Sequence, residues 1–160
     1  MRSVVIFDSE FGNTREIAEA IAAELQASGV VEVDKVGTPA AEAVIPTNVD
    51  LLIVGGPTQM HGISPAMRAY LGTFHSGSLA GIRVAAFDTR VAGWPLFTGA
   101  ASGGIAKVLE TFGATMVVPP ESFIVSGKEG PLAEGELERA RAWARQIIAV
   151  VPQPAEAVAG

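Results

Sequence analysis

Short apolar runs alternate with segments of helical periodicity along most of the chain. Apolar residues recur every three or four positions between the runs, which predicts helices that bury one face. The runs expected to form strands are Ser3–Phe7, Val30–Val36, Leu51–Val54, Ile82–Phe87, and Thr115–Val118 with Phe123–Val125, which Pro119-Pro120 separates. The segments expected to form helices are Asn13–Ser28, Pro65–Phe74, Ile105–Phe112 and Glu134–Val151. Continuous apolar strands separated by helices predict a parallel sheet covered on both faces, joined by right-handed crossovers.

Two parts of the chain depart from this alternation. Gly37–Asn48 contains Pro39 and Pro46, so at most a short helix is expected there. We predict one domain over residues 1–151, followed by a flexible Pro- and Ala-rich tail over 152–160. In the last helix we expect Leu137, Ala140, Ala144, Ile147 and Ile148 to face inward and Trp143 to lie partly buried at the helix edge.

Ligands of doubly wound sheets bind at the carboxyl ends of the strands. Three loops are expected to leave those ends, over residues 8–13, 55–64 and 88–103. The sequence therefore predicts a site where these loops meet.

Composition narrows what this site can do. The 160 residues include no cysteine, which excludes disulfides, thiol catalysis and cysteine-ligated metals. A net charge of −6 with scattered basic residues argues against a nucleic-acid partner. The apolar runs are shorter than the roughly 20 residues that a membrane helix needs, and the N-terminus does not read as a signal peptide. We therefore expect a cytoplasmic protein without a membrane partner, and a monomer or weak dimer.

The loop after the first strand has the chemistry of an anion site. A helix N-terminus offers unpaired N–H groups and the positive end of the helix dipole. Ser9 and Thr14 add hydroxyls, Asn13 adds an amide, and Gly12 lets the backbone close around a phosphate. The alternative is that Asn13 or Thr14 only caps the helix.

Other phosphate-binding motifs do not match. A P-loop needs Gly-Lys-Ser/Thr, but Asn13 follows Gly12, and the run 126–129 (Ser-Gly-Lys-Glu) is not followed by a helix. A Gly-x-Gly-x-x-Gly fingerprint is absent. What remains resembles the phosphate loop of the flavodoxin family, in which a hydroxyl residue and two variable positions precede Gly-Asn-Thr/Ser. Ser9, Gly12, Asn13 and Thr14 match this pattern, although Phe11 stands where many relatives have a hydroxyl.

The resemblance extends over residues 1–150 and implies the fold, the cofactor and the contacts. It implies a flavodoxin-like, three-layer, doubly wound five-stranded parallel sheet of strand order 2-1-3-4-5. It implies FMN, with its 5′-phosphate held by Ser9, Glu10, Phe11, Gly12, Asn13 and Thr14. The fifth strand lacks the long insertion of long-chain flavodoxins, and in this the chain resembles the short-chain members of the family.

The same resemblance places the flavin ring between two further loops. The first supplies Pro57, Thr58, Gln59, Met60, His61 and Gly62, and Gly62 would permit the peptide flip by which family members bind N5 of the reduced ring. The second supplies Thr89, Arg90, Val91 and Trp94. The usual stacking aromatics are missing, so Met60 or Trp94 would pack on the ring.

Each of these residues also has a purely structural alternative. Thr58 would cap a loop, His61 would be solvated, and Trp94 would cover the long loop. Arg90 would either stabilise the anionic reduced flavin and raise its potential, or pair with Asp88 or a helix carboxylate.

No loop supplies a nucleophile–base pair or a metal cluster, so the chemistry would be that of the flavin. We expect an FMN-binding electron carrier that works with redox partner proteins such as a flavodoxin reductase. The Gly-Pro-Thr start of the second loop is similar to flavodoxin-like quinone reductases, so an NAD(P)H-dependent quinone or FMN reductase is one alternative. A flavodoxin-fold binding module with weak or no FMN is the other.

Overall fold

The computed structural model describes residues 1–39, 41, 48–93 and 99–153 of the chain. Its strands form one sheet in the order β2-β1-β3-β5, with β6 and β7 both paired to the outer side of β5. The strands are β1 (Arg2–Phe7), β2 (Val30–Lys35), β3 (Leu51–Gln59), β4 (Gly62–Ile63), β5 (Arg83–Val91), β6 (Thr115–Met116) and β7 (Glu121–Val125). All of these pairings are parallel except that of β4, which returns antiparallel along the end of β3.

The predicted α/β fold and its strand order are confirmed, but the sheet has seven strand segments instead of five. The predicted fifth strand is divided into β6 and β7 by Pro119 and Pro120, which have no N–H to donate to a neighbouring strand. The seventh segment, β4, was not predicted, because two residues are too few to show a hydrophobic period.

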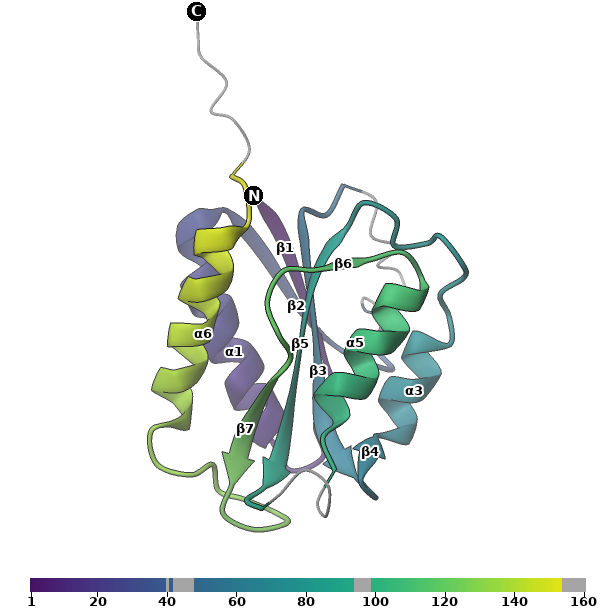
Figure 1. Cartoon of the computed structure of the whole chain (residues 1–160). Helices are drawn as coiled ribbons and strands as arrows, with labels where there is room; N and C mark the ends of the chain where they lie inside the picture. Colours follow the sequence, from purple (N-terminus) through teal and green to yellow (C-terminus); the bar gives the residue numbers. More distant parts are fainter. Residues whose placement is uncertain (40, 42–47, 94–98, 154–160) are drawn as a thin grey trace, which may run out of the picture.

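The helices lie in two layers on either side of the sheet (Figure 1). Helices α1 and α6 cover one face, and α3 and α5 cover the other. The helical segments are α1 (Asn13–Leu25), the short 3₁₀ turn η1 (Gln26–Ser28), α3 (Pro65–Leu71), α5 (Ala101–Thr111) and α6 (Glu136–Val150). No helix within the described ranges is long and apolar enough to cross a membrane.

The alternation of side chains along each strand divides the core between these two layers. Val4 and Ile6 of β1 pack toward α3 and α5, whereas Val5 and Phe7 pack toward α1 and α6. All four are buried, so β1 is apolar on both faces, as expected for a central parallel strand.

Helix α6 differs from the prediction at two positions. Leu137, expected to face inward, is exposed. Trp143, expected at the helix edge, is buried, and its ring lies edge-on 6.1 Å from Phe87 and 6.0 Å from Phe123. The buried face of α6 is therefore directed at the aromatic cluster that Trp143 forms with Phe87 of β5 and Phe123 of β7.

Some predictions concern residues outside the described ranges. These are Trp94, most of the segment 40–47 in which a short helix was considered, and residues 154–160 of the expected tail.

Candidate functional site

The loop between β1 and α1 forms the floor of the site. The Asp8 N–H donates to the Gly55 carbonyl at 3.0 Å, which continues the pairing of β1 with β3. Gly12 then adopts a left-handed conformation (φ +92°) and is the N-cap residue of α1, without any side-chain cap. Neither Asn13 nor Thr14 therefore caps the helix. The first intrahelical bond is that of Glu16 N–H to the Gly12 carbonyl at 3.1 Å, so the N–H groups of Asn13 and Thr14 precede it.

The polar side chains of this loop have distinct partners. Ser9 Oγ accepts hydrogen bonds from the N–H groups of Gly12 (3.1 Å) and Arg15 (3.3 Å), which closes the loop. The hydroxyls of Thr14 and Thr89 are hydrogen-bonded at 2.7 Å, which links α1 to the end of β5. Because both threonines are buried, this pair fixes the distance between the two loops.

Asn13 makes a contact that the sequence did not predict. Its Nδ2 donates to the carbonyl of Glu129 at 3.1 Å, in the loop that follows β7. A Cβ added to Gly130, whose φ is +100°, would lie 2.5 Å from Asn13 Oδ1, so this position requires glycine. The Asn13 amide thus holds the loop after β7 in place by a hydrogen bond and by close packing.

The second loop is a tight hairpin between β3 and β4. Gln59 pairs with Gly62 across it, and the two central residues, Met60 (φ 46°) and His61 (φ 67°), both have left-handed backbones. This is the pattern of a type I′ turn, which Asn-Gly normally provides. Gly62 belongs to the strand β4 and directly follows the Met60–His61 peptide at the centre of the turn, and the peptide flip expected at Gly62 stays a prediction.

Thr58 and Asp88 fix the start of α5 beside this hairpin. Thr58 Oγ1 accepts the Ala101 N–H at 2.9 Å, and Asp88 Oδ2 accepts the Ser102 N–H at 2.8 Å. Burial raises the pKa of the Asp88 carboxyl, although hydrogen bonds from Ser102 and the charge of Arg90 oppose the shift. Thr58 thus accepts a backbone N–H at the start of α5, where the alternative from the sequence was capping of a loop, and Thr58 also lines the cavity.

The third loop follows β5 and carries Arg90. Its Nη1 donates to the carbonyl of Gly93 at 2.9 Å and to that of Val91 at 3.4 Å. The guanidinium therefore orders the backbone of its own loop at the edge of the site, and its charge acts on Asp88.

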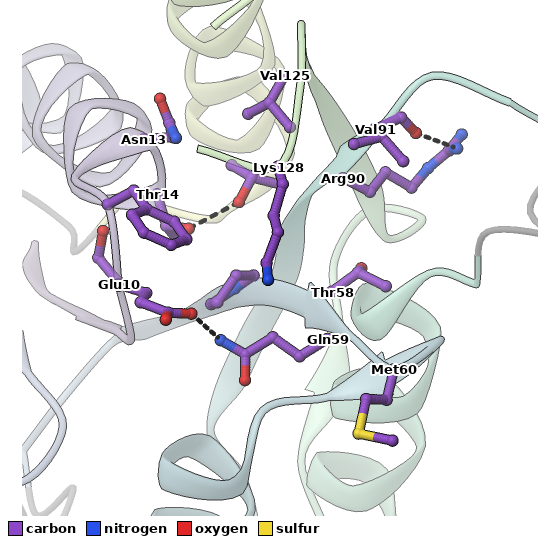
Figure 2. Close-up of a pocket in the computed structure, with 14 residues that line it drawn as sticks. Glu10, Asn13, Thr14, Thr58, Gln59, Met60, Arg90, Val91, Val125 and Lys128 are labelled. Carbon is purple, nitrogen blue, oxygen red and sulfur yellow. Dashed lines mark hydrogen bonds between the residues drawn. The ribbon is translucent and has the colours of Figure 1, made fainter. Parts of the chain in front are cut away.

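These loops enclose one cavity of about 490 Å³ at the carboxyl ends of β1, β3, β5 and β7 (Figure 2). Its volume lies in the range of roughly 300–1,000 Å³ that is typical of cofactor sites. The predicted residues that line it are Ser9, Glu10, Phe11, Asn13, Thr14, Pro57, Thr58, Gln59, Met60, Thr89, Arg90 and Val91. Gly12, His61 and Gly62 shape the loops without lining the cavity, and Trp94 lies outside the described residues.

Two lining residues, Val125 and Lys128, were not predicted. The sequence does contain a signal that places both residues at the site, namely the end of the last parallel strand. If Phe123–Val125 ends a parallel strand, the loop after it must open at the same edge as the other three loops.

The charged lining residues are one carboxylate, Glu10, and two cations, Arg90 and Lys128. Glu10 is bound to the Gln59 amide at 2.9 Å, which bridges the first two loops. The lining is thus positive on balance in a chain of net charge −6, which favours an anionic ligand.

A doubly wound parallel sheet, with a loop from the first strand to the head of the first helix, is typical of nucleotide- and flavin-binding proteins. The family model for flavodoxins matches residues 5–143, and the chain belongs to this family. No curated protein sequence matches the chain significantly.

Solved structures support the assignment of the fold. The chain is similar to oxidised flavodoxin 1 of Bacillus cereus (20% identity, TM-score 0.78, covering 95% of this chain and 100% of that one). It is similar to the flavodoxin of Streptococcus pneumoniae TIGR4 (22% identity, TM-score 0.75, 93% and 99% covered). A WrbA-like flavodoxin from Agrobacterium tumefaciens is also similar (18% identity, TM-score 0.73, 96% and 99% covered).

Proposed function

We propose that this protein binds FMN non-covalently in the 490 Å³ cavity and carries electrons between redox proteins. The observation that carries the proposal is the meeting of three predicted flavodoxin-like loops around this one cavity. FMN supplies the redox chemistry, since it accepts and donates electrons singly or in pairs. The protein holds and orients the cofactor and limits its contact with water.

The residues present fit the two ends of FMN. At one end, the first N–H groups of α1 and the hydroxyls of Ser9 and Thr14 suit a phosphate. At the other end, Met60 and Val91 offer apolar surface from two different loops, which suits an isoalloxazine ring.

The cavity mouth suits a protein partner. Its apolar side chains are unusually exposed for residues of their kind: Met60 by 99%, Phe11 by 44% and Val91 by 40%. An apolar rim around a cofactor site lets a partner approach the ring closely while water is displaced. We therefore assign the docking of redox partners to this rim.

The described lining residues contain no side chain that is arranged for bond-making chemistry. The Ser9 hydroxyl oxygen accepts two backbone N–H groups, and the Thr14 and Thr89 hydroxyls bind each other. No group of three His, Asp or Glu side chains in the described ranges could hold a metal ion. These contacts favour electron carriage over hydrolysis or group transfer.

Titration with FMN tests the binding. Quenching of flavin fluorescence at micromolar protein, and a bound flavin that dithionite reduces, are the expected results. If the protein quenches the fluorescence of neither FMN nor riboflavin, the proposed FMN binding is contradicted, and the binding-module alternative is favoured.

Steady-state turnover then separates a carrier from a reductase. A carrier oxidises NAD(P)H only when a separate flavodoxin reductase is added, whereas a quinone reductase does so with quinone alone. Rapid quinone-dependent oxidation without the added reductase would contradict the carrier role.

A further inference from the structure

Lys128 lies at the tip of a well-defined turn over the cavity. Residues 126–131 loop out after β7, and the loop is closed by the Ser126 N–H, which donates to the Pro131 carbonyl at 2.8 Å. Within it, the Gly130 N–H donates to the Gly127 carbonyl at 3.0 Å, so Lys128 and Glu129 are the two central residues of a turn. Backbone hydrogen bonds therefore define the turn that carries Lys128.

The turn rests on the phosphate loop. Asn13 Nδ2 holds the Glu129 carbonyl at 3.1 Å, and Gly130 packs directly against the same amide. The Lys128 side chain extends from this turn into the cavity, between the residues of the phosphate loop and the end of β3 (Figure 2). A residue remote in sequence is thus held over the head of α1.

Lys128 has no ionic partner within the described part of the chain. By contrast, arginines and glutamates of the neighbouring helix α6 do form ion pairs. The donors expected for a phosphate are partly engaged elsewhere. The Asn13 amide is bound to Glu129, and the N–H groups of Gly12 and Arg15 are bound to Ser9. The N–H groups of Asn13 and Thr14 remain at the head of α1, and a positive charge beside them would further stabilise a phosphate dianion near Glu10.

We propose that Lys128 is a phosphate-binding residue of the FMN site and that Asn13 is its positioning residue. The inference rests on the proposed function. It assigns the FMN phosphate a cation from the loop after β7, in place of the Asn13 amide that the family pattern implies. Binding should accordingly depend on ionic strength, because an exposed ammonium–phosphate contact is screened by salt.

The test compares FMN with riboflavin, which lacks the phosphate, by quenching of flavin fluorescence at low and high NaCl. We expect Lys128→Gln to weaken FMN binding about tenfold at low salt and to leave riboflavin binding unchanged. Lys128→Arg should retain most of the FMN affinity. Lys107→Gln, an exposed lysine of α5 outside the cavity lining, is the matched control and should bind both flavins as the wild type does.

The outcomes separate this inference from the function on which it rests. A wild type that binds neither flavin overturns both. A wild type that binds FMN, with Lys128→Gln unchanged, overturns only the role of Lys128. An equal loss of FMN and riboflavin also overturns it, because Lys128 would then act on the ring or on the fold.

A double-mutant cycle tests the positioning role of Asn13. If Asn13 acts through Lys128, Asn13→Ala in the Lys128→Gln background should cost less than about twofold in FMN affinity, although Asn13→Ala alone weakens binding severalfold. Independent losses that multiply would show that Asn13 contacts the phosphate itself and would overturn its assignment as a positioning residue.

Discussion

Two cations that follow β7 meet opposite surroundings. Arg139 of α6 forms ion pairs with Glu136 (2.8 Å) and Glu121 (2.9 Å), donates to the Ser122 carbonyl, and lies 4.7 Å above the Phe123 ring. Lys128, at the tip of the loop between β7 and α6, extends into the cavity without an ion pair in the described ranges. Among the described residues, Arg139 thus has ionic partners within the protein, whereas Lys128 of the same segment has none.

The difference separates charges that hold the fold from charges that meet a ligand. Burial alone would raise the pKa of the Glu136 carboxyl, but hydrogen bonds from Arg139 and the Ile124 N–H and the charge of Arg139 outweigh it, so its pKa lies below its usual value. A cluster of this kind contributes to stability whether or not a ligand is bound. Lys128 should contribute chiefly when an anion arrives.

The largest expected effect is on the cluster around Arg139. Glu136→Ala should lower the free energy of unfolding by about 2–3 kcal/mol, because it removes the acceptor of the Ile124 N–H (2.6 Å) and a partner of Arg139. Urea denaturation measures this change. Glu138→Ala on the same helix is the control, since the Glu138 side chain is 66% exposed against 11% for Glu136, and it should change stability little.

The same carboxylate predicts a dependence on pH. Because the pKa of Glu136 is lower in the folded than in the unfolded protein, its stabilisation is present above the ordinary value of 4.5 and is lost as the pH falls through the folded-state pKa. The pKa of Asp88 is raised, so its effect on stability has the opposite dependence on pH. This effect is common to the wild type and Glu136→Ala and cancels in their difference. The stability difference between wild type and Glu136→Ala should therefore shrink in acid, and a difference that stays constant from pH 7 to pH 3 would contradict the assignment.

A smaller effect is expected at the cavity hairpin. Left-handed backbones at Met60 and His61 cost free energy that asparagine and glycine do not incur. Replacing Met60→Asn and His61→Gly together should raise the free energy of unfolding by about 1–2 kcal/mol. Thermal and urea denaturation measure the gain, and a lower stability would show that contacts of the two side chains outweigh the backbone term.

The smallest effect is expected at Lys128 itself. Lys128→Gln without cofactor should leave the free energy of unfolding within about 0.5 kcal/mol of the wild type, as for a surface substitution. Denaturation of the apoprotein measures it. A loss as large as that of Glu136→Ala would place Lys128 with the structural charges and remove the contrast.

Much of the fold could be predicted because its strands are apolar on both faces. The run Leu51–Val54 was recognised for that reason, yet β3 continues to Gln59. Its last residues are glycine, proline and polar, and they are held in the sheet by pairing with Gly62 and Ile63 and with the end of β5. Such pairings are tertiary, so no local pattern reveals them.

The candidate site could be predicted only as far as motifs and strand ends allow. Ser9 to Thr14 carry a local pattern, whereas Lys128 has meaning only once β7 is seen as the last parallel strand. From the sequence, the run 126–129 was considered only as a P-loop and was rejected because no helix follows it. Whether Asn13 faces a phosphate or the Glu129 carbonyl depends on contacts between residues 116 positions apart.

Pro119 and Pro120 also have a consequence for how copies of this chain behave toward one another. They lie on the outer edge of the sheet, between β6 and β7, where a continuous strand would present a row of unpaired N–H and C=O groups. Such an edge can recruit a strand from a second molecule and start aggregation. Neither proline can donate a hydrogen bond, so the edge is interrupted between β6 and β7, and we expect this break to disfavour self-association of this kind.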